Sequence, residues 1–394
     1  MNKKTENMVF LGLLFFLCIF GVVMLYSSSY VLAGSNGELG FDKTFYIKRQ
    51  VGGMLVGLLL FLLVQKIDYY RLKKLVPLVV LLSLLGLVLV FAPKVGASVK
   101  GANRWLKAGS ITLQPSEFSR FALIGYFAYY ADKKGKIFGS KLAHYLPSAV
   151  IFALMNVLIL MEPDYGMSAI ICVLFFSLIF VAGFPIRPLI GIFATGVMAF
   201  VILLISSPYR MKRFFAYLDP QSYAKTSGYQ VIQSLVGFAN GGFVGTGIGA
   251  GKQKLFYLPE IHTDYIFAVI GEELGFLGVF LVATMFLVLL FSSFRISRRA
   301  EDQFGKFFAF GTGVSLALCA FMNMGVSLKL LPPKGMVLPF VSYGRSSIIA
   351  HMVALGVVYK ISCVAKEKPE DESADRWGRD RRSRIPGIID CRGD

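Results

Sequence analysis

The sequence predicts an all-α integral membrane protein with about ten transmembrane helices and a large extracytoplasmic loop between the seventh and the eighth. Of its 394 residues, 56% are hydrophobic, and the mean hydropathy is +0.65. A soluble domain has only about 45–50% apolar residues. Apolar runs long enough to cross a ~30 Å hydrocarbon core recur along the chain. They are continuous rather than alternating, which argues against a β-barrel.

Ten apolar segments define the predicted spans, and the second and fourth are the shortest. The first follows MNKKTEN and resembles a signal peptide, but its apolar core exceeds the usual ~7–15 residues, so we interpret it as a retained membrane helix. In chain order the segments are Met8–Ala33, Val51–Val64, Leu75–Ala92, Glu117–Ala131, Tyr145–Met161, Gly166–Phe184, Leu189–Ser206, Asp264–Phe291, Phe304–Leu328 and Phe340–Cys363.

The net charge of +18 fits a membrane protein better than a nucleic-acid-binding protein, because Lys and Arg collect in cytoplasmic loops. One alternate set of loops is basic, which predicts that these loops and both termini are cytoplasmic. Residues 1–365 then form one membrane domain, and the charged segment 366–394 is expected to be a disordered cytoplasmic tail. The orienting residues are Lys3, Lys4, Lys66, Arg71, Lys73, Lys74, Lys133, Lys134, Lys136, Lys141, Arg295, Arg298 and Arg299.

Two loops on the predicted outer face are also basic, against this bias. A bound anion outside the membrane would explain them, although long loops also translocate regardless of charge. The first loop, Pro93–Ser116, carries Lys94, Lys100, Arg104 and Lys107. The second, Ser207–Thr263, carries Arg210, Lys212, Arg213, Lys225, Lys252 and Lys254.

Asp264 is the leading candidate for a catalytic residue. It stands where the second loop enters an apolar helix, and a carboxylate at the mouth of a membrane helix is costly to keep there. It suits a general base or an ion ligand at the outer face. The alternative is a helix N-cap, a role that suits both Asp264 and Thr263.

Further carboxylates lie within or near the spans. Glu272 and Glu273 each need a basic partner or a proton, and the candidate partners are Arg120 and Arg345. A structural ion pair is the preferred interpretation, and a proton relay is the alternative.

The segment before the fourth span adds two candidates. Trp105 beside Arg104 and Lys107 suits either an interface anchor or a platform for a sugar. In the sequence QPSE, Ser116 is predicted to cap a helix, whereas Glu117 keeps a possible role in a cavity.

The glycine-rich segment GGFVGTGIGAGKQK does not match a phosphate-binding P-loop, because Thr246 and Gln253 occupy positions that require Gly and Ser or Thr. A nest of backbone N–H groups beside Lys252 and Lys254 remains a candidate phosphate site. The five cysteines form no CxxC pair and no Cys/His cluster, so neither a disulfide framework nor a zinc site is predicted.

These segments together resemble the SEDS family (shape, elongation, division and sporulation) of bacterial cell-wall synthesis. The matching motifs occur in family order over almost the whole chain before the tail, and GYQ and YRMKR are most similar to the FtsW/SpoVE branch. Arg120 and Arg345 depart from the family pattern, which has Lys and Gly there. The motifs are NRW, QPSEF, EPDYG, YRMKRFFAYLDP, GYQVIQS, the glycine-rich segment, YLPEIHTDYIFAVIGEELG and LPFVSYG.

The resemblance implies a peptidoglycan glycosyltransferase that polymerises lipid II at the outer face of the cytoplasmic membrane, for a division or sporulation septum. Asp264 is carried over as the catalytic residue and Trp105 as a functional position. The implied partners are lipid II, the growing glycan strand, membrane lipid, a class B penicillin-binding transpeptidase and septum proteins, with no nucleic acid. The candidate substrate-binding residues are Arg104, Trp105, Lys107, Glu117, Arg210, Arg213, Lys252 and Lys254, with a divalent metal ion as a possible cofactor.

Two other functions remain open at this point. A lipid II flippase would use Glu117, Glu272 and Glu273 as a charged pathway. A scaffold would only recruit the transpeptidase, and the Asp264 carboxylate would then be dispensable.

Overall fold

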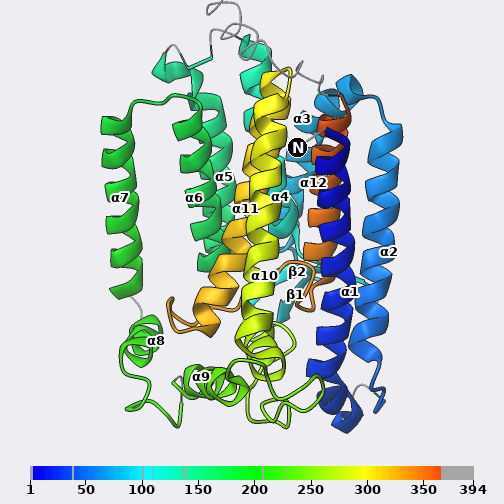
Figure 1. Ribbon diagram of the computed structural model, residues 1–394. Coiled ribbons are helices and arrows are strands. Elements are labelled where there is room, and N and C mark those ends of the chain that lie inside the picture. Colours follow the sequence, from blue (N-terminus) through cyan, green and yellow to red (C-terminus); the bar gives the residue numbers. More distant parts are fainter. Residues whose placement is uncertain are drawn as a thin grey trace, which may run out of the picture.

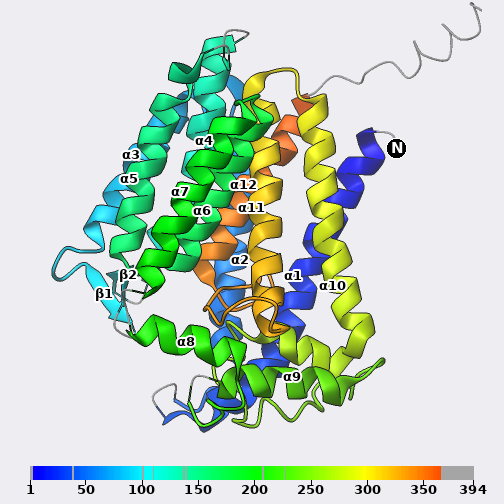
Figure 2. The ribbon, with the colours of Figure 1, turned by 90° about the vertical axis from the view of Figure 1, so that its left-hand side faces the viewer.

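A computed structural model describes residues 3–37, 40–99, 102–109, 111–135, 138–139, 141–205, 208–226 and 228–364 of the chain. Its main body is a bundle of long helices (Figures 1 and 2). The bundle helices are α1 (Lys3–Ser35), α2 (Phe45–Lys66), α3 (Tyr69–Leu89), α4 (Pro115–Lys134), α5 (Leu146–Met161), α6 (Tyr165–Val181), α7 (Ile186–Ile205), α10 (Ile266–Arg299), α11 (Gln303–Ser327) and α12 (Arg345–Val364). Lys100, Lys136 and the tail 366–394 lie outside the described residues.

The predicted multi-pass membrane fold is confirmed. Within the described ranges, α1, α2, α3, α10, α11 and α12 are long and apolar enough to cross a bilayer, and the helices Leu146–Met161, Tyr165–Val181 and Ile186–Met198 are shorter but apolar. These helices correspond to nine of the predicted segments.

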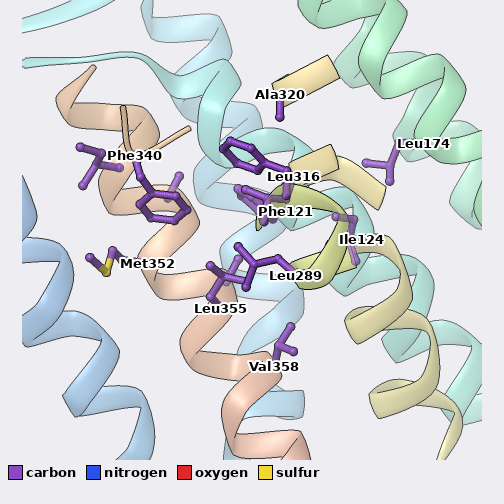
Figure 3. Packing of buried hydrophobic residues seen from close by; sticks show 14 of the residues in the cluster. Phe121, Ile124, Leu174, Leu289, Leu316, Ala320, Phe340, Met352, Leu355 and Val358 are labelled. Atoms are coloured by element: carbon purple, nitrogen blue, oxygen red, sulfur yellow. The ribbon is translucent and has the colours of Figure 1, made fainter. Parts of the chain in front are cut away.

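Helix α4 is more polar than the others because it lies inside the bundle rather than against lipid. It packs against α3, α5, α11 and α12, and most of its residues are buried. Figure 3 shows its side chains Phe121 and Ile124 among buried residues of α6, α10, α11 and α12. This central position explains why the fourth segment is only weakly apolar in the sequence.

One end of the bundle holds a network of ion pairs and is called the basic end. Lys73 lies 2.8 Å from Asp132 and also pairs with Asp302, and Arg299 pairs with Glu6. These contacts join the starts of α1, α3 and α11 to the ends of α4 and α10. The basic residues that set the predicted orientation therefore also hold this end of the bundle together.

The opposite end, called the site end, contains structure that the sequence did not predict. The first basic loop folds into a three-stranded antiparallel sheet of β1 (Gly96–Val99), β2 (Ala102–Ala108) and β3 (Ile111–Leu113). The second loop forms α8 (Pro208–Leu218) and α9 (Tyr229–Gly241), which Figure 1 shows beyond the end of the bundle. The described part of the chain is thus mostly helical, with one small sheet.

Helix α10 is broken near the site end. Gly275 has φ +63 and ψ −159, which is outside the helical region. The glycine-rich segment fills the break: the Phe276 N–H donates to the Gly242 carbonyl over 2.9 Å, and the Gly247 N–H donates to the Glu273 carbonyl over 3.0 Å. Residues 266–274 therefore form a short helix of their own, whose open backbone groups are satisfied by the loop.

Candidate active site

Asp264 lies at the site end, two residues before α10 begins. Tyr265, not Asp264, is the N-cap residue of α10, and its side chain makes no capping hydrogen bond. The Asp264 N–H donates to the Glu260 carbonyl over 3.0 Å, and its own carbonyl accepts a 2.9 Å hydrogen bond from the Asn323 side chain. The backbone of Asp264 is thus held from both sides.

The loop of residues 328–344, between α11 and α12, packs against the segment that carries Asp264. The Asn323 amide nitrogen bonds the Asp264 and the Met336 carbonyls, and the Ser342 hydroxyl donates to the Thr263 carbonyl over 2.6 Å. The Tyr343 N–H donates to the His262 carbonyl over 2.9 Å. These bonds fix the two loops to each other, which positions Asp264.

Gly335 in the loop 328–344 lies directly against the Asp264 carboxylate. A Cβ atom at this position would be 2.7 Å from Asp264 Oδ2, closer than real Cβ contacts allow. A side chain at position 335 would therefore force the Asp264 carboxylate to shift. The sequence analysis did not identify Gly335, because nothing in LPPKG indicates which side chain faces it.

Next to Gly335, Lys334 belongs to a chain of charges that reaches the sheet. Lys334 Nζ lies 3.2 Å from Asp164 Oδ1, and Arg104 Nη1 lies 3.7 Å from Asp164 Oδ2. Arg104 also donates to the carbonyls of Glu162 (3.0 Å) and Pro163 (2.7 Å). The sequence analysis proposed Arg104 but missed Lys334 and Asp164, although Asp164 is part of the EPDYG motif.

The positive charge of Arg213, on α8, acts on Tyr265 and on Lys334. Burial raises the pKa of Tyr265, Asp264 raises it further, and Arg213 opposes both. Burial lowers the pKa of Lys334, Asp164 opposes this effect, and Arg104 and Arg213 lower it further. We call Asp264, Arg104, Asp164, Lys334 and Arg213 the charged cluster.

Glu162 is a buried carboxyl group beside the charged cluster. Its side chain is 0% exposed, and neither carboxyl oxygen has a hydrogen-bond partner among the described residues. Burial raises its pKa to about 8, nearby Asp164 raises it further, and Arg104 opposes both. At neutral pH this group is mostly protonated, so the positive charge of Arg104 is not cancelled by Glu162.

The other predicted residues of the two basic loops lie at the same end. Trp105 and Lys107 are on β2 with Arg104, where Trp105 pairs with Ala97 of β1, and Lys107 is exposed. Arg210 belongs to α8, three residues before Arg213. Their role in binding a substrate stays a prediction.

Glu117 belongs to a different, buried cluster. Its carboxylate lies 2.5 Å from Arg120 Nη2, and the same guanidinium nitrogen is 3.2 Å from His351 Nε2. Ser116 does not cap α4 as expected, because the helix starts one residue earlier, with Pro115 in its first turn and Gln114 at the N-cap. Arg345 lies outside this cluster, and its guanidinium donates to Thr112 Oγ1 of β3 over 3.0 Å.

The expected pairing of Glu272 and Glu273 with Arg120 or Arg345 is wrong. Glu273 lies 2.7 Å from Lys254 Nζ, and Ser27 of α1 donates to Glu273 over 2.7 Å. The Glu272 carboxylate accepts from the Lys252 N–H (3.0 Å) and the Gln253 N–H (3.1 Å). The backbone nest proposed for a phosphate therefore holds a carboxylate of the protein itself, and Lys254 is buried in an ion pair.

The arginine and lysine side chains at this end suit an anion. Over the part of the chain that the structure describes, no group of three His, Cys, Asp or Glu side chains is placed to hold a metal ion. Chemically, the charged cluster offers two carboxylates, of which Asp264 is the candidate proton acceptor, and three cations that can stabilise an anionic leaving group.

Fold and site together define a polytopic membrane protein whose charged site lies at one end of the helix bundle. The sequence model of the family described as "Cell cycle protein" (FtsW, RodA and SpoVE) matches residues 7–367, so the chain belongs to this family.

Curated relatives are similar over nearly the whole chain. The probable peptidoglycan glycosyltransferase FtsW of Trichlorobacter lovleyi is 42% identical over 92% of this chain and 94% of its own. The protein of the same name from Saccharophagus degradans is 36% identical over 87% and 88%.

Solved structures of other proteins have a similar fold. A chain from a study of how a peptidoglycan synthase complex coordinates polymerisation and crosslinking has a TM-score of 0.70 at 27% identity, covering 89% of this chain and 98% of that one. The rod-shape-determining protein RodA of Thermus thermophilus has a TM-score of 0.67 at 24% identity, covering 92% and 98%, which supports the fold.

Proposed function

We propose that this protein is a peptidoglycan glycosyltransferase that polymerises lipid II into glycan strands for cell division. The observation that carries the proposal is the Asp264 carboxylate, which lies against Gly335, next in the chain to Lys334, and whose charge acts with that of Arg213 on Tyr265. The names of relatives up to 42% identical over most of the chain support the same activity.

In the proposed reaction, a sugar hydroxyl of one chain attacks the anomeric carbon of the other. A new C–O glycosidic bond forms, the bond from the anomeric carbon to the diphosphate breaks, and the diphosphate leaves with the electron pair. Asp264 takes the hydroxyl proton as general base. Arg104, Arg213 and Lys334 stabilise the charge that develops on the leaving diphosphate.

The activity implies an orientation and partners. The site end lies at the outer face of the cytoplasmic membrane, at the division septum, and both termini and the tail 366–394 lie inside. A class B penicillin-binding transpeptidase is the proposed partner, in line with the synthase complex that contains a similar chain. If a divalent ion takes part, the Asp264 or the Asp164 carboxylate would hold it, and the ion would help to neutralise the charge of the diphosphate.

The flippase alternative has less support. Its pathway would need Glu272 and Glu273 to exchange protons or contact substrate, yet Glu272 is bonded to backbone N–H groups and Glu273 to Lys254.

Polymerisation of purified lipid II by the wild type and by Asp264→Asn tests the proposal. The wild type should form glycan strands, and the variant should be slower by about 10²- to 10⁴-fold, the usual contribution of a general base. Equal yields would remove Asp264 from catalysis. Wild-type protein that moves lipid II across vesicles without forming polymer would support the flippase instead.

A further inference from the structure

An apolar groove lies between α3 and α5 on the surface of the bundle. It has a volume of about 480 Å³, and its walls include Leu81, Leu85 and Val88 of α3 and Leu154, Val157 and Leu158 of α5. Helix α4 packs against both α3 and α5 and so lies behind the groove. Most of these side chains are exposed.

The groove lies in the half of each helix that is nearer the site end. Helix α3 ends at Leu89 and leads into β1, and α5 ends at Met161, directly before Glu162. Figure 2 shows β1 and β2 beyond these ends of α3 and α5.

Arg104 stands at the end of the groove. The Glu162 N–H donates to the Leu158 carbonyl, and Arg104 Nε donates to the Glu162 carbonyl. Because four residues of α-helix rise about 6 Å, the guanidinium lies about one turn beyond the last groove residue of α5. Lys334 contacts the other oxygen of the Asp164 carboxylate, so a second cation follows Arg104 beyond this end of the groove.

We infer that this groove holds the polyprenyl chain of a lipid-linked diphosphate, with the diphosphate in contact with Arg104 and Lys334, the two cations that Asp164 bridges. The inference rests on the proposed function and adds the place where the lipid part of the substrate binds. A diphosphate has two phosphate groups and can contact both cations, whereas the single phosphate of a membrane phospholipid can satisfy only one of them fully.

How strongly the groove binds the polyprenyl chain depends on the bilayer lipid around it. Bilayer lipid is as apolar as the groove, so burial of the chain there gains little transfer free energy. Close packing and the diphosphate contacts must then supply the selectivity. We therefore expect groove substitutions to change the preference for chain length moderately, and Arg104 substitutions to weaken binding of every diphosphate.

The direct test is photo-crosslinking of the purified full-length protein in vesicles by an undecaprenyl diphosphate that carries diazirines along its chain. Labelling should map to the α3 and α5 walls, be competed by unlabelled undecaprenyl diphosphate but not by phosphatidylglycerol, and fall in Arg104→Gln. Labelling elsewhere would overturn the inference, and equal competition by phosphatidylglycerol would make the groove a general phospholipid site.

A kinetic test uses Leu154→Trp and Val157→Phe, which fill the groove. Each should raise KM for lipid II with an undecaprenyl chain about 3- to 10-fold and leave KM for a farnesyl analogue unchanged. Leu59→Trp, on an exposed face of α2 outside the groove, is the matched control and should behave like the wild type. An equal effect of the groove variants on both substrates would contradict the inference.

The two tests separate this inference from the proposed function. Crosslinking needs no turnover, so groove labelling in a protein that makes no polymer would sink the enzymatic proposal alone. Polymer formation with labelling outside the groove would sink the groove alone.

Discussion

At the scale of single residues, the site depends on residues that position Asp264 without taking part in the proposed reaction. Asn323 holds the backbone of Asp264, and Gly335 leaves the space that its carboxylate occupies. A general base has to lie within hydrogen-bond reach of the proton that it takes. The neighbours of Asp264 therefore matter for rate even though they touch no reacting atom.

Gly335→Ala tests this view. The added methyl would lie 2.7 Å from Asp264 Oδ2 and must displace the carboxylate. A displacement of about 1 Å can lower a rate by about 10²-fold, so we expect a loss of that order in lipid II polymerisation while the protein stays folded. Gly196→Ala, where nothing lies within 4 Å of the new methyl, is the control. Unchanged activity in Gly335→Ala would contradict the proposed position of Asp264.

Glu162 predicts a dependence of stability on pH. Its pKa is raised from 4.5 to about 8 in the folded protein, mainly by burial. As the pH rises from 4.5 to 8, the unfolded state loses this proton while the folded state keeps it, so the stabilisation present at low pH is lost. Above pH 8 the effect levels off.

Thermal unfolding in detergent over this pH range measures the effect. The Glu162→Gln variant cannot titrate at this position and should show a smaller fall in stability between pH 4.5 and 8 than the wild type. Parallel curves for the two proteins would show that Glu162 titrates normally.

At the scale of elements, the apolar segments predicted most of the bundle, because a bilayer requires about 20 apolar residues per span and this requirement is visible in any one segment. The sheet, α8 and α9 were not predicted, since short amphipathic pieces in polar loops have no such constraint. Ion-pair partners were also missed: Lys254 and Glu273 meet only because the glycine-rich segment folds back over the break in α10. Asp264 was found from its place in the sequence, whereas Lys334 and Gly335 required the packing of two distant loops.

The Lys254–Glu273 pair stabilises this fold-back. Both side chains are almost fully buried, so removal of one partner leaves an uncompensated charge. Lys254→Met should lower the free energy of unfolding by about 3–5 kcal/mol, and the double variant Lys254→Met/Glu273→Leu should recover much of that loss.

Denaturant unfolding of the purified protein checks this expectation. Lys252→Met is the matched control, because that lysine is exposed and only its backbone N–H is bonded to Glu272. A single variant as stable as the control would mean that the pair contributes nothing to stability.

At the scale of the whole molecule, the two ends of the bundle differ in how they use charge. The basic end pairs its lysines and arginines with acidic residues of neighbouring helices. At the site end, Arg104 and Lys334 share a single carboxylate, that of Asp164, and Arg213 adds a third positive charge near Lys334. This asymmetry matches an enzyme that receives an anionic substrate from one side only.

Labelling of intact cells with a membrane-impermeant maleimide tests the orientation. In a background without native cysteines, Lys107→Cys on exposed β2 should react from outside. Lys66→Cys, at the basic end of α2, should react only after the membrane is opened. The reverse pattern would place the site in the cytoplasm and exclude polymerisation outside.

The break at Gly275 has a mechanical consequence. If α10 were one continuous helix, any tilt imposed by a thicker or thinner bilayer would be passed directly to the residue at its N-terminal end. Here the lipid-embedded part of α10 joins the short helix 266–274 through a joint at Gly275, and that helix is fastened to the glycine-rich segment. We expect the rate of turnover to tolerate changes in the acyl-chain length of the bilayer lipids, because a tilt of the main part of α10 is not passed directly to Asp264.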